Sequence, residues 1–465
     1  MRDSNISITP YHLLSILTLE ISKGINKHAT ALFEGIIPED KEDEYMRLAL
    51  RNGFSTIVGQ DDTGQTIPLF AGIIKELTIR TENGVQIARG QLISESSRMD
   101  LKPHIRTFQD TGLTYKQVLD TYLSYYPDNN YIMTVGKDQP IAHWLLQYRE
   151  TDWQFTMRLA SHFNSFLVAE YRMGGLKFFF GLPKRSASYI LNPTHYNVTK
   201  DLIGHSRKKQ NGLAELREID SLCYTFTDRE IYNIADPVLF HNKQLYIYAI
   251  DSKMKGGELI HQYTLKTQEG FKTLRQYNEK LTGASLSANI TAITKDMVQI
   301  VVTEDENKQH SGAIWYPYST VYSSPDGTGF YAMPEKGDAV RLYCPNEQEN
   351  QAYVISAVHL AVSGARDNPD NKSFKTKYGK EVLLTPNAIF LTNNNGLAIV
   401  LQDGEGITIS SDKAVSIQTT GDMNIASETA AISIVAPDSI TMEQGGNKIE
   451  MAEEITVAGA QGKIQ

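Results

Sequence analysis

Catalytic or metal-binding chemistry in this chain would be sought in its histidines, its cysteines, its carboxylates or a glycine-rich motif; acidic residues are plentiful, but those near the C-terminus stand in repeat turns, where they are expected to keep the protein soluble. There are eleven histidines, the last of them His359, and two cysteines, Cys223 and Cys344, which lie far apart. Two distant cysteines exclude a disulfide framework and a cysteine-rich zinc site. The 465 residues contain no Gly-x-Ser-x-Gly turn, no Walker A loop, no His-Glu-x-x-His pair and no dinucleotide-binding glycine pattern. We therefore predict a protein that is not an enzyme and that holds no cofactor and no metal ion.

The most regular spacing belongs to aliphatic residues near the C-terminus, and the chemistry it offers is burial. One series repeats every eight residues, at Leu383, Leu391, Ile399, Ile407, Val415, Met423 and Ala431. A second aliphatic residue stands two positions after four members of that series, at Leu401, Ile409, Ile417 and Ile425. After a shift of one residue the pairs continue as Ile432/Ile434, Ile440/Met442, Ile449/Met451 and Ile455/Val457. Residues two apart share a strand face, and the intervening Gly, Asp, Asn, Ser and Thr favour turns, so the pattern predicts short strands stacked with a period of eight.

Such a narrow stripe cannot build a core from one chain, because repeat units need neighbours to cover their apolar face. Three copies wound around a common axis would bury the stripe and leave the acidic residues outside. The alternative is an antiparallel meander docked on another domain, but a docked face should be rich in aromatics, and the last of the 43 aromatic residues is Phe390. We therefore predict a trimeric β-helix spike over residues 383–465. Its core is formed by Leu391, Ile399, Leu401, Ile407, Ile409, Val415, Ile417, Ile425, Ile432, Ile434 and Ile440, and its tip by Ile455, Val457 and Ile464.

The elements upstream of the repeat are mainly strands. The first 95 residues contain five strand candidates with turn residues between them, at 15–21, 29–37, 53–58, 67–80 and 85–93. Asn83-Gly84 predicts a type I′ hairpin turn, since both residues tolerate positive φ. Residues 1–95 are therefore expected to form a first β domain, a small antiparallel barrel or sandwich.

A helical insertion and two further β domains are expected next. Within residues 96–175, apolar residues recur at helical spacing over 114–126, and Thr114/Gln117 and Thr151/Gln154 each fit a capping box. A second β domain is predicted over 176–285 from strand candidates at 177–180, 223–226, 244–250 and 257–267. An OB-fold barrel is predicted over 286–362 from five candidates at 288–293, 297–302, 312–316, 339–343 and 352–358. Residues 363–382 are assigned to a linker.

Several of these segments resemble one family. The run 147–155, with the sequence Gln-Tyr-Arg-Glu-Thr-Asp-Trp-Gln-Phe, is similar to the segment that opens the second helix in VgrG and phage late-control-D hub proteins. Residues 106–110 are similar to the same family's entry into its first helix. Residues 327–340 and 353–358 resemble two strand regions of its OB barrel. Together with the octad repeat, the resemblance covers nearly the whole chain.

The resemblance implies the homotrimeric hub and spike of a contractile injection machine, which is a phage tail, a phage-tail-like bacteriocin or a type VI secretion apparatus. Residues 1–285 would form a six-lobed ring that docks on the hexameric tail tube or inner-tube protein and contacts baseplate proteins. Residues 286–362 would clamp the trimer, and residues 383–465 would pierce the target cell envelope. A small separate tip protein of the PAAR type would cover the end of the spike, although two glycines within 459–462 leave self-capping open.

Charge and composition bound the remaining possibilities. The net charge is −9, and residues 401–465 hold three lysines against ten acids, so no basic tract is available for nucleic acid. The short run Arg207-Lys208-Lys209 is predicted to be a solvated loop. With no export signal and no membrane span, the protein is expected to be made in the cytoplasm and assembled in a phage tail-like particle. The alternatives are an effector or cell-wall hydrolase on the same scaffold, or a trimeric receptor-binding fibre.

Overall fold

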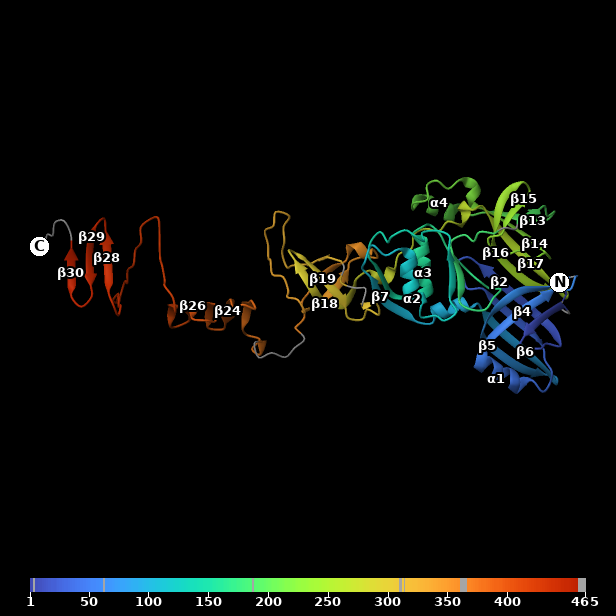
Figure 1. The fold of residues 1–465 in the computed structure, drawn as a ribbon, viewed down its shortest axis with the longest axis horizontal. Coiled ribbons are helices and arrows are strands. Elements are labelled where there is room, and N and C mark those ends of the chain that lie inside the picture. Colours follow the sequence, from blue (N-terminus) through green and yellow to red (C-terminus); the bar gives the residue numbers. More distant parts are fainter. Residues whose placement is uncertain are drawn as a thin grey trace. The chain divides into compact units, whose positions relative to one another are not determined.

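The computed structural model describes residues 1–2, 5–61, 63–185, 188–308, 312, 314–359 and 366–458 (Figure 1). The chain separates into two compact units, Met1–Leu360 and Ala361–Gln465. Among the helices of these described ranges, none has the length and apolarity that a membrane crossing needs.

One large sheet organises the first unit. Its main path runs through β1 (Ile6–Thr9), β4 (Phe54–Gln60), β5 (Thr66–Glu82), β6 (Val85–Ile93), β3 (Thr30–Ile36), β2 (Ser15–Gly24), β16 (Lys243–Lys255), β17 (Glu258–Lys266), β14 (Leu222–Asp228) and β13 (Tyr196–Lys200). Off this path, β15 (Pro237–Phe240) pairs with β16 and with β12 (Tyr189–Leu191). The regions expected to be two β domains therefore share one sheet. They meet at the antiparallel pair of β2 and β16, where Gly24 lies opposite Ala249 and Glu20 opposite Lys253.

The sheet also curls back toward the N-terminus. The backbone N–H of Leu259, in β17, donates a hydrogen bond to the Met1 carbonyl at 2.9 Å, and Arg2 forms an isolated bridge with Glu258. Because Arg2 leads into β1, the strands from β1 round to β17 form a nearly closed barrel. A single core fills it, to which both halves contribute large buried side chains: Leu19, Phe33, Ile57, Phe70, Ile247, Leu259 and Tyr263.

Local sequence accounts for the turns and helices that were predicted. Asn83 and Gly84 have φ angles of 51° and 81°, as the type I′ turn between β5 and β6 requires. Helix α2 (Tyr115–Leu123) begins after Thr114 and helix α3 (Asp152–Ser161) after Thr151, each with the complete capping box. Both helices lie in the insertion, beside a sheet of β10 (Leu167–Ala169), β11 (Lys177–Phe180) and β8 (Asn130–Met133) and a strand pair, β7 (Pro103–Phe108) with β9 (Leu145–Thr151).

Two helices were not predicted. Helix α1 (Glu42–Asn52) places Tyr45 in the barrel core but exposes most of its other described side chains. Helix α4 (Leu202–Gln210) buries none of its residues, so no apolar period marks it in the sequence. The expected loop at Arg207-Lys208-Lys209 is wrong, because these residues form the last turn of α4.

A five-stranded sheet follows the large one. Its order is β20 (Tyr316–Pro317), β19 (Met297–Val302), β18 (Ala284–Thr294), β21 (Ala339–Cys344) and β22 (Tyr353–Ile355). Tyr318 bridges Val354, so the first and last strands of the sheet meet. The strand expected at 312–316 is confined to Tyr316–Pro317. Short 3-10 turns connect the elements of this unit, at η2 (Glu95–Asp100), η3 (Glu218–Ser221), η4 (Glu269–Phe271), η5 (Glu279–Leu281) and η7 (Glu349–Gln351).

The second unit consists of two small antiparallel sheets. The first contains β23 (Lys372–Lys375), β24 (Glu381–Thr385), β25 (Ala388–Thr392), β26 (Leu397–Gln402) and β27 (Gly406–Ser411), paired in chain order. The second contains β28 (Ile440–Gln444), β29 (Asn447–Met451) and β30 (Ile455–Ala458). Residues 412–439 between them are described without helix or strand.

Candidate functional site

The candidate site is the apolar face of the second unit. Residues directly opposite each other in an antiparallel pair project from the same face of the sheet. Val382 lies opposite Leu391, Leu391 opposite Ile399, and Ile399 opposite Ile409, so one face runs across four strands. The register adds other apolar residues to the same face, which we call the stripe: Phe374, Leu384, Ile389, Leu397, Leu401 and Ile407.

The stripe is uncovered. Leu391 is 44% exposed, Ile399 38% and Ile407 71%, although isoleucine and leucine are among the residues most often buried in folded proteins. Among residues 366–455, in the part of the chain that the structure describes, Ala388 is the only buried side chain. A contiguous exposed apolar surface of this kind marks an interaction site.

The start of the octad series needs one correction. Leu383 keeps the spacing of eight, but it pairs with Phe390 and therefore projects from the opposite face to Leu391. The reason is the tight connection between β24 and β25, which sets the register so that Val382 and Leu384 join the stripe instead. The sequence pattern missed Val382, Leu384, Ile389 and Leu397 because they do not follow the period.

The later predicted core residues are also exposed. Val415 is 60% exposed, Ile417 and Ile425 are each 71% exposed, Ile432 50% and Ile434 62%. They lie in residues 412–439, where the described chain pairs with no strand of its own.

In the last sheet the predicted pairs share one face. Ile440 lies opposite Met451, Met442 opposite Ile449, and Ile449 in turn opposite Val457. Ile455, predicted to lie at the tip, is 73% exposed. Ile464 falls outside the described residues.

Polar turns separate the strands of the first sheet. Asn394 and Gly396 have φ angles of 54° and 86°, which allow the chain to reverse between β25 and β26. The Asn393 side chain accepts hydrogen bonds from the backbone N–H groups of Asn395 and Leu397, at 2.8 and 3.0 Å. The turns are therefore satisfied locally, whereas the strands between them lack an apolar partner.

The family-like run 147–155 has a structural role that the sequence analysis did not identify. Arg158, in α3, donates hydrogen bonds to Glu150 at 2.8 Å and to Glu349 at 2.7 Å, and all three side chains are buried. Glu349 lies in η7, next to the five-stranded sheet. Burial by itself lowers the pKa of the Arg158 guanidinium, but the charges and hydrogen bonds of Glu150 and Glu349 outweigh burial and raise that pKa. The spacing of Glu150 and Arg158 across a strand end and the next helix could have indicated such a pair.

A second buried network lies beside the first. Arg106, in β7, is 2.5 Å from Asp152 and donates to the Gln147 side chain at 2.9 Å. The Tyr126 hydroxyl donates to Asp152 at 2.7 Å, and burial together with that carboxylate raises the pKa of Tyr126. The backbone N–H of Thr107 donates to Asp305 at 3.0 Å, which ties the insertion to the five-stranded sheet.

Two side-chain groups have a superficially catalytic composition. Ser252 Oγ lies 2.6 Å from His261 Nδ1, but both residues are buried cross-strand neighbours in the barrel, and burial lowers the pKa of His261 to about 4. His28 bridges Ser96 and Asp100 at 2.8 Å each, and Ser96 is 1% exposed. Neither serine can reach a substrate, so both groups act as internal hydrogen bonds. Within the described ranges, no three metal-ligating side chains come together.

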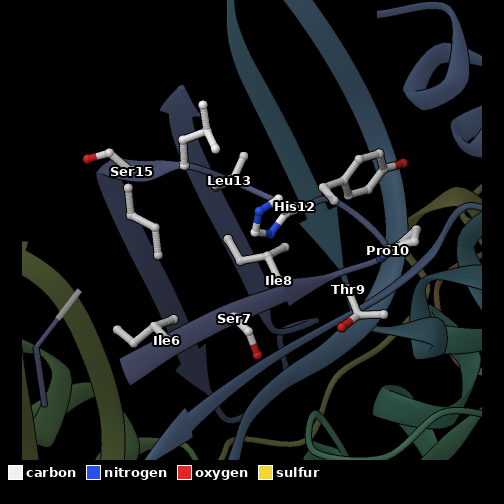
Figure 2. A pocket seen from close by; sticks show the side chains of 11 residues that line it. Ile6, Ser7, Ile8, Thr9, Pro10, His12, Leu13 and Ser15 are labelled. Carbon is white, nitrogen blue, oxygen red and sulfur yellow. The ribbon is translucent and has the colours of Figure 1, made fainter. Parts of the chain in front are cut away.

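The first unit also contains cavities. Figure 2 shows one of about 510 Å³, lined by the continuous segment from Ile6 to Ile16, in which the His12 ring lies near Ile8. Its other lining residues are aliphatic or hydroxyl-bearing, and it contains neither a carboxylate nor a cysteine. The geometry is that of a corner between β1 and the start of β2.

The fold has counterparts among solved structures. No protein-family model and no curated protein sequence matches the chain. Among solved structures, the E. coli c3393 protein, a type VI secretion component described as similar to T4 bacteriophage tail proteins gp27 and gp5, aligns over 76% of this chain and 99% of its own, with a TM-score of 0.54 and 11% identity. A chain of the half-lidded Francisella PdpA-VgrG complex aligns over 87% of both chains, with a TM-score of 0.56 and 10% identity.

These similarities give the chain the fold of VgrG-like hub proteins. The resemblance predicted from residues 147–155 is confirmed at the level of the fold. The mainly β, multidomain class is confirmed as well. The predicted boundaries, the trimer and the spike core remain predictions.

Proposed function

We propose that the protein is a structural, homotrimeric hub and spike of a contractile injection system. The observation that carries the proposal is the stripe, a continuous apolar face that one chain leaves exposed. Fully burying a leucine or isoleucine side chain stabilises a fold by about 1.5–3 kcal/mol. The eight leucine and isoleucine residues of the stripe left in water would favour association strongly, and three copies around an axis would bury them together.

The unpaired middle segment supports the same assembly. Between β27 and β28, the chain keeps its aliphatic pairs but has no strand partner among the described residues. Backbone N–H and C=O groups in such a segment need partners. Two further copies would supply both the strand partners and the apolar cover for Val415, Ile417 and Ile425.

The hub ring would close through the two open edges of the large sheet. β13 is a terminal strand whose five residues are all exposed. At the other edge, β5 beyond Ile74 pairs with β6 but with no second described strand. The eight strands from β5 to β13 on the main path alternate in direction, so β13 of one copy would run antiparallel to β5 of the next. Unpaired strand edges of this kind readily accept another chain.

The roles follow from this arrangement. Residues 1–285 would dock on the tail tube or inner-tube protein and on baseplate proteins, residues 286–362 would clamp the trimer as an OB-fold barrel, and residues 383–465 would form the β-helix spike that pierces the target envelope. The tip residue Ile455, which is exposed, would contact a separate PAAR-type tip protein. One structural relative is a type VI secretion component similar to bacteriophage tail proteins, and another belongs to a PdpA-VgrG complex, which supports this class of machine.

Light scattering on the purified chain tests the assembly. We expect a mass three times that of one chain, and a strongly weakened trimer after deletion of residues 363–465. Asp412→Ala serves as the matched control, because Asp412 is exposed and lies in the same segment without belonging to the stripe. A monomer at micromolar concentration would contradict the proposal.

A further inference from the structure

A large groove lies beside helix α4. It has a volume of about 980 Å³, at the upper end of the usual range for ligand pockets. One wall is a single face of α4, formed by Gly204, Arg207, Lys208 and Asn211, which follow helical spacing. The opposite wall is the extended chain from Thr273 to Tyr277. A groove of this volume that is open to solvent can admit a segment of a polypeptide chain.

Several cationic side chains line the groove or lie beside it. Arg207, Lys208 and Arg275 line it, and Lys266 lies beside it, 4.2 Å from the ring of the lining residue Tyr248. None of these four side chains forms an ion pair with a carboxylate in the described part of the chain. Neighbouring lysines differ: Lys272 pairs with Glu269 at 2.8 Å, as do other surface lysines of this lobe with nearby acids.

The cations also repel one another. Burial and the nearby Lys266 ammonium lower the pKa of Lys208, whose amine donates only to the Gly270 carbonyl, at 3.3 Å. Arg275 donates to a histidine ring nitrogen, His143 Nε2, at 3.2 Å. Holding like charges together without a counter-ion is unfavourable, and an anionic ligand would remove that cost.

Aromatic side chains also line the groove. Tyr248 and Phe271 pack edge to face, with ring centroids 5.0 Å apart, and the Arg275 guanidinium lies 5.5 Å from the Tyr277 ring. Aromatic and arginine side chains are enriched at the centres of protein interfaces. The chemistry therefore combines negative charge with flat apolar groups.

Two acidic residues of the groove favour a peptide over a nucleic acid as its ligand. Glu279 and Glu347 line the same groove as the cations. They would repel a uniformly charged phosphate backbone, but they would pair with a basic residue of a polypeptide. We propose that this groove binds an extended segment of a partner protein that carries acidic and aromatic residues together with a basic residue.

Fluorescence anisotropy with the full chain tests the proposal, which does not depend on the trimer. The probe is a fluorescein-labelled peptide of repeated Glu-Glu-Tyr units ending in two lysines, and the comparison peptide has glutamine in place of every glutamate. We expect the acidic peptide to bind more tightly than the glutamine peptide, and added salt to weaken it. The double variant Arg207→Glu/Arg275→Glu should lose at least about tenfold in affinity, which corresponds to about 1.4 kcal/mol.

Lys209→Glu is the matched control. Lys209 lies in the same last turn of α4 and is exposed, but it does not line the groove, so it changes the charge of the helix end without touching the site. Unchanged circular dichroism of all variants excludes unfolding as the cause. Equal losses in the control and the double variant, absence of binding by the acidic peptide, or tighter binding of a labelled oligothymidylate would each overturn the proposal.

Discussion

The two units of the chain differ in whether they bury their apolar side chains. The first buries large aromatic residues such as Phe33, Phe70, Trp153 and Phe155 in cores that its own strands and helices close. The second keeps small aliphatic residues exposed on its strands, as far as its described residues go. A self-sufficient domain needs bulky side chains from several layers, whereas a unit built for symmetric assembly can leave its apolar face to identical neighbours.

The strongest test of this contrast is a charge in the stripe segment. Ile417→Asp would place three carboxylates in one apolar layer of the proposed trimer, and burying unpaired like charges costs several kcal/mol each. We expect loss of the trimer or a large fall in its melting temperature. Asp412→Ala should change stability by no more than about 0.5 kcal/mol, as is usual for exposed sites. Equal losses for the two variants would show that Ile417 does not face the axis.

In the first unit, a buried ion pair should stabilise the fold of the single chain, whether or not the trimer forms. Arg158→Met leaves Glu150 and Glu349 buried without their cation, and breaking a buried ion pair in this way costs about 3–5 kcal/mol. Denaturant unfolding followed by tryptophan fluorescence measures this, because Trp144, Trp153 and Trp315 all lie in the first unit. Arg149→Met is the control, since Arg149 belongs to the same run but is exposed. A similar loss in both variants would argue against the network.

The stability of the two units should respond differently to acid. Burial, and then Arg275, lower the pKa of His162 to about 3, and burial with Lys23 lowers that of His261 to about 4. An unfolded histidine titrates near 6.5, so between about pH 4 and 6.5 the unfolded chain binds protons that the folded chain does not. The first unit therefore loses stability as the pH falls through that window, and the second, whose described residues contain no histidine, lacks this contribution.

Two spectroscopic probes distinguish the units in this experiment. Tryptophan fluorescence reports the first unit, while far-ultraviolet circular dichroism retains the β signal of the second. We expect the fluorescence midpoint to move to lower denaturant concentration between pH 6.5 and 4. His261→Phe should reduce that dependence, and an unchanged pH profile would mean that His261 is protonated in the folded state.

The smallest expected effect concerns a helix cap. Thr114→Ala removes the hydroxyl that accepts from the Gln117 N–H, and losing such a cap costs about 1 kcal/mol. Thr121→Ala, in the interior of the same helix, should be neutral or slightly stabilising because alanine favours helix. Thermal melts of the two variants check the difference, and a larger loss for Thr121→Ala would contradict it.

The parts of this fold that depend on interactions between residues close in sequence could be predicted from the sequence. The capping boxes at Thr114 and Thr151 and the Asn83-Gly84 turn depend on residues three or fewer positions apart, so they could be predicted. The union of two expected β domains could not, because it depends on the pairing of β2 with β16 across more than two hundred residues. Helix α4 escaped because all of its side chains are at least partly exposed.

The candidate site was predictable in outline for a related reason. The period of its aliphatic residues can be read directly from the sequence. The register between β24 and β25 cannot, and that register places Leu383 on the opposite face of the sheet. The buried network around Arg158 joins residues nearly two hundred positions apart, and no spacing rule connects Glu150 to Glu349.

The exposed stripe also constrains how the protein is made. A ribosome releases the N-terminal unit first, at roughly 5–20 residues per second, so that unit has time to fold before the octads emerge. The aliphatic strands of the stripe follow that unit in the chain, so in the proposed trimer they would meet one another after the first units have folded rather than contact half-folded cores.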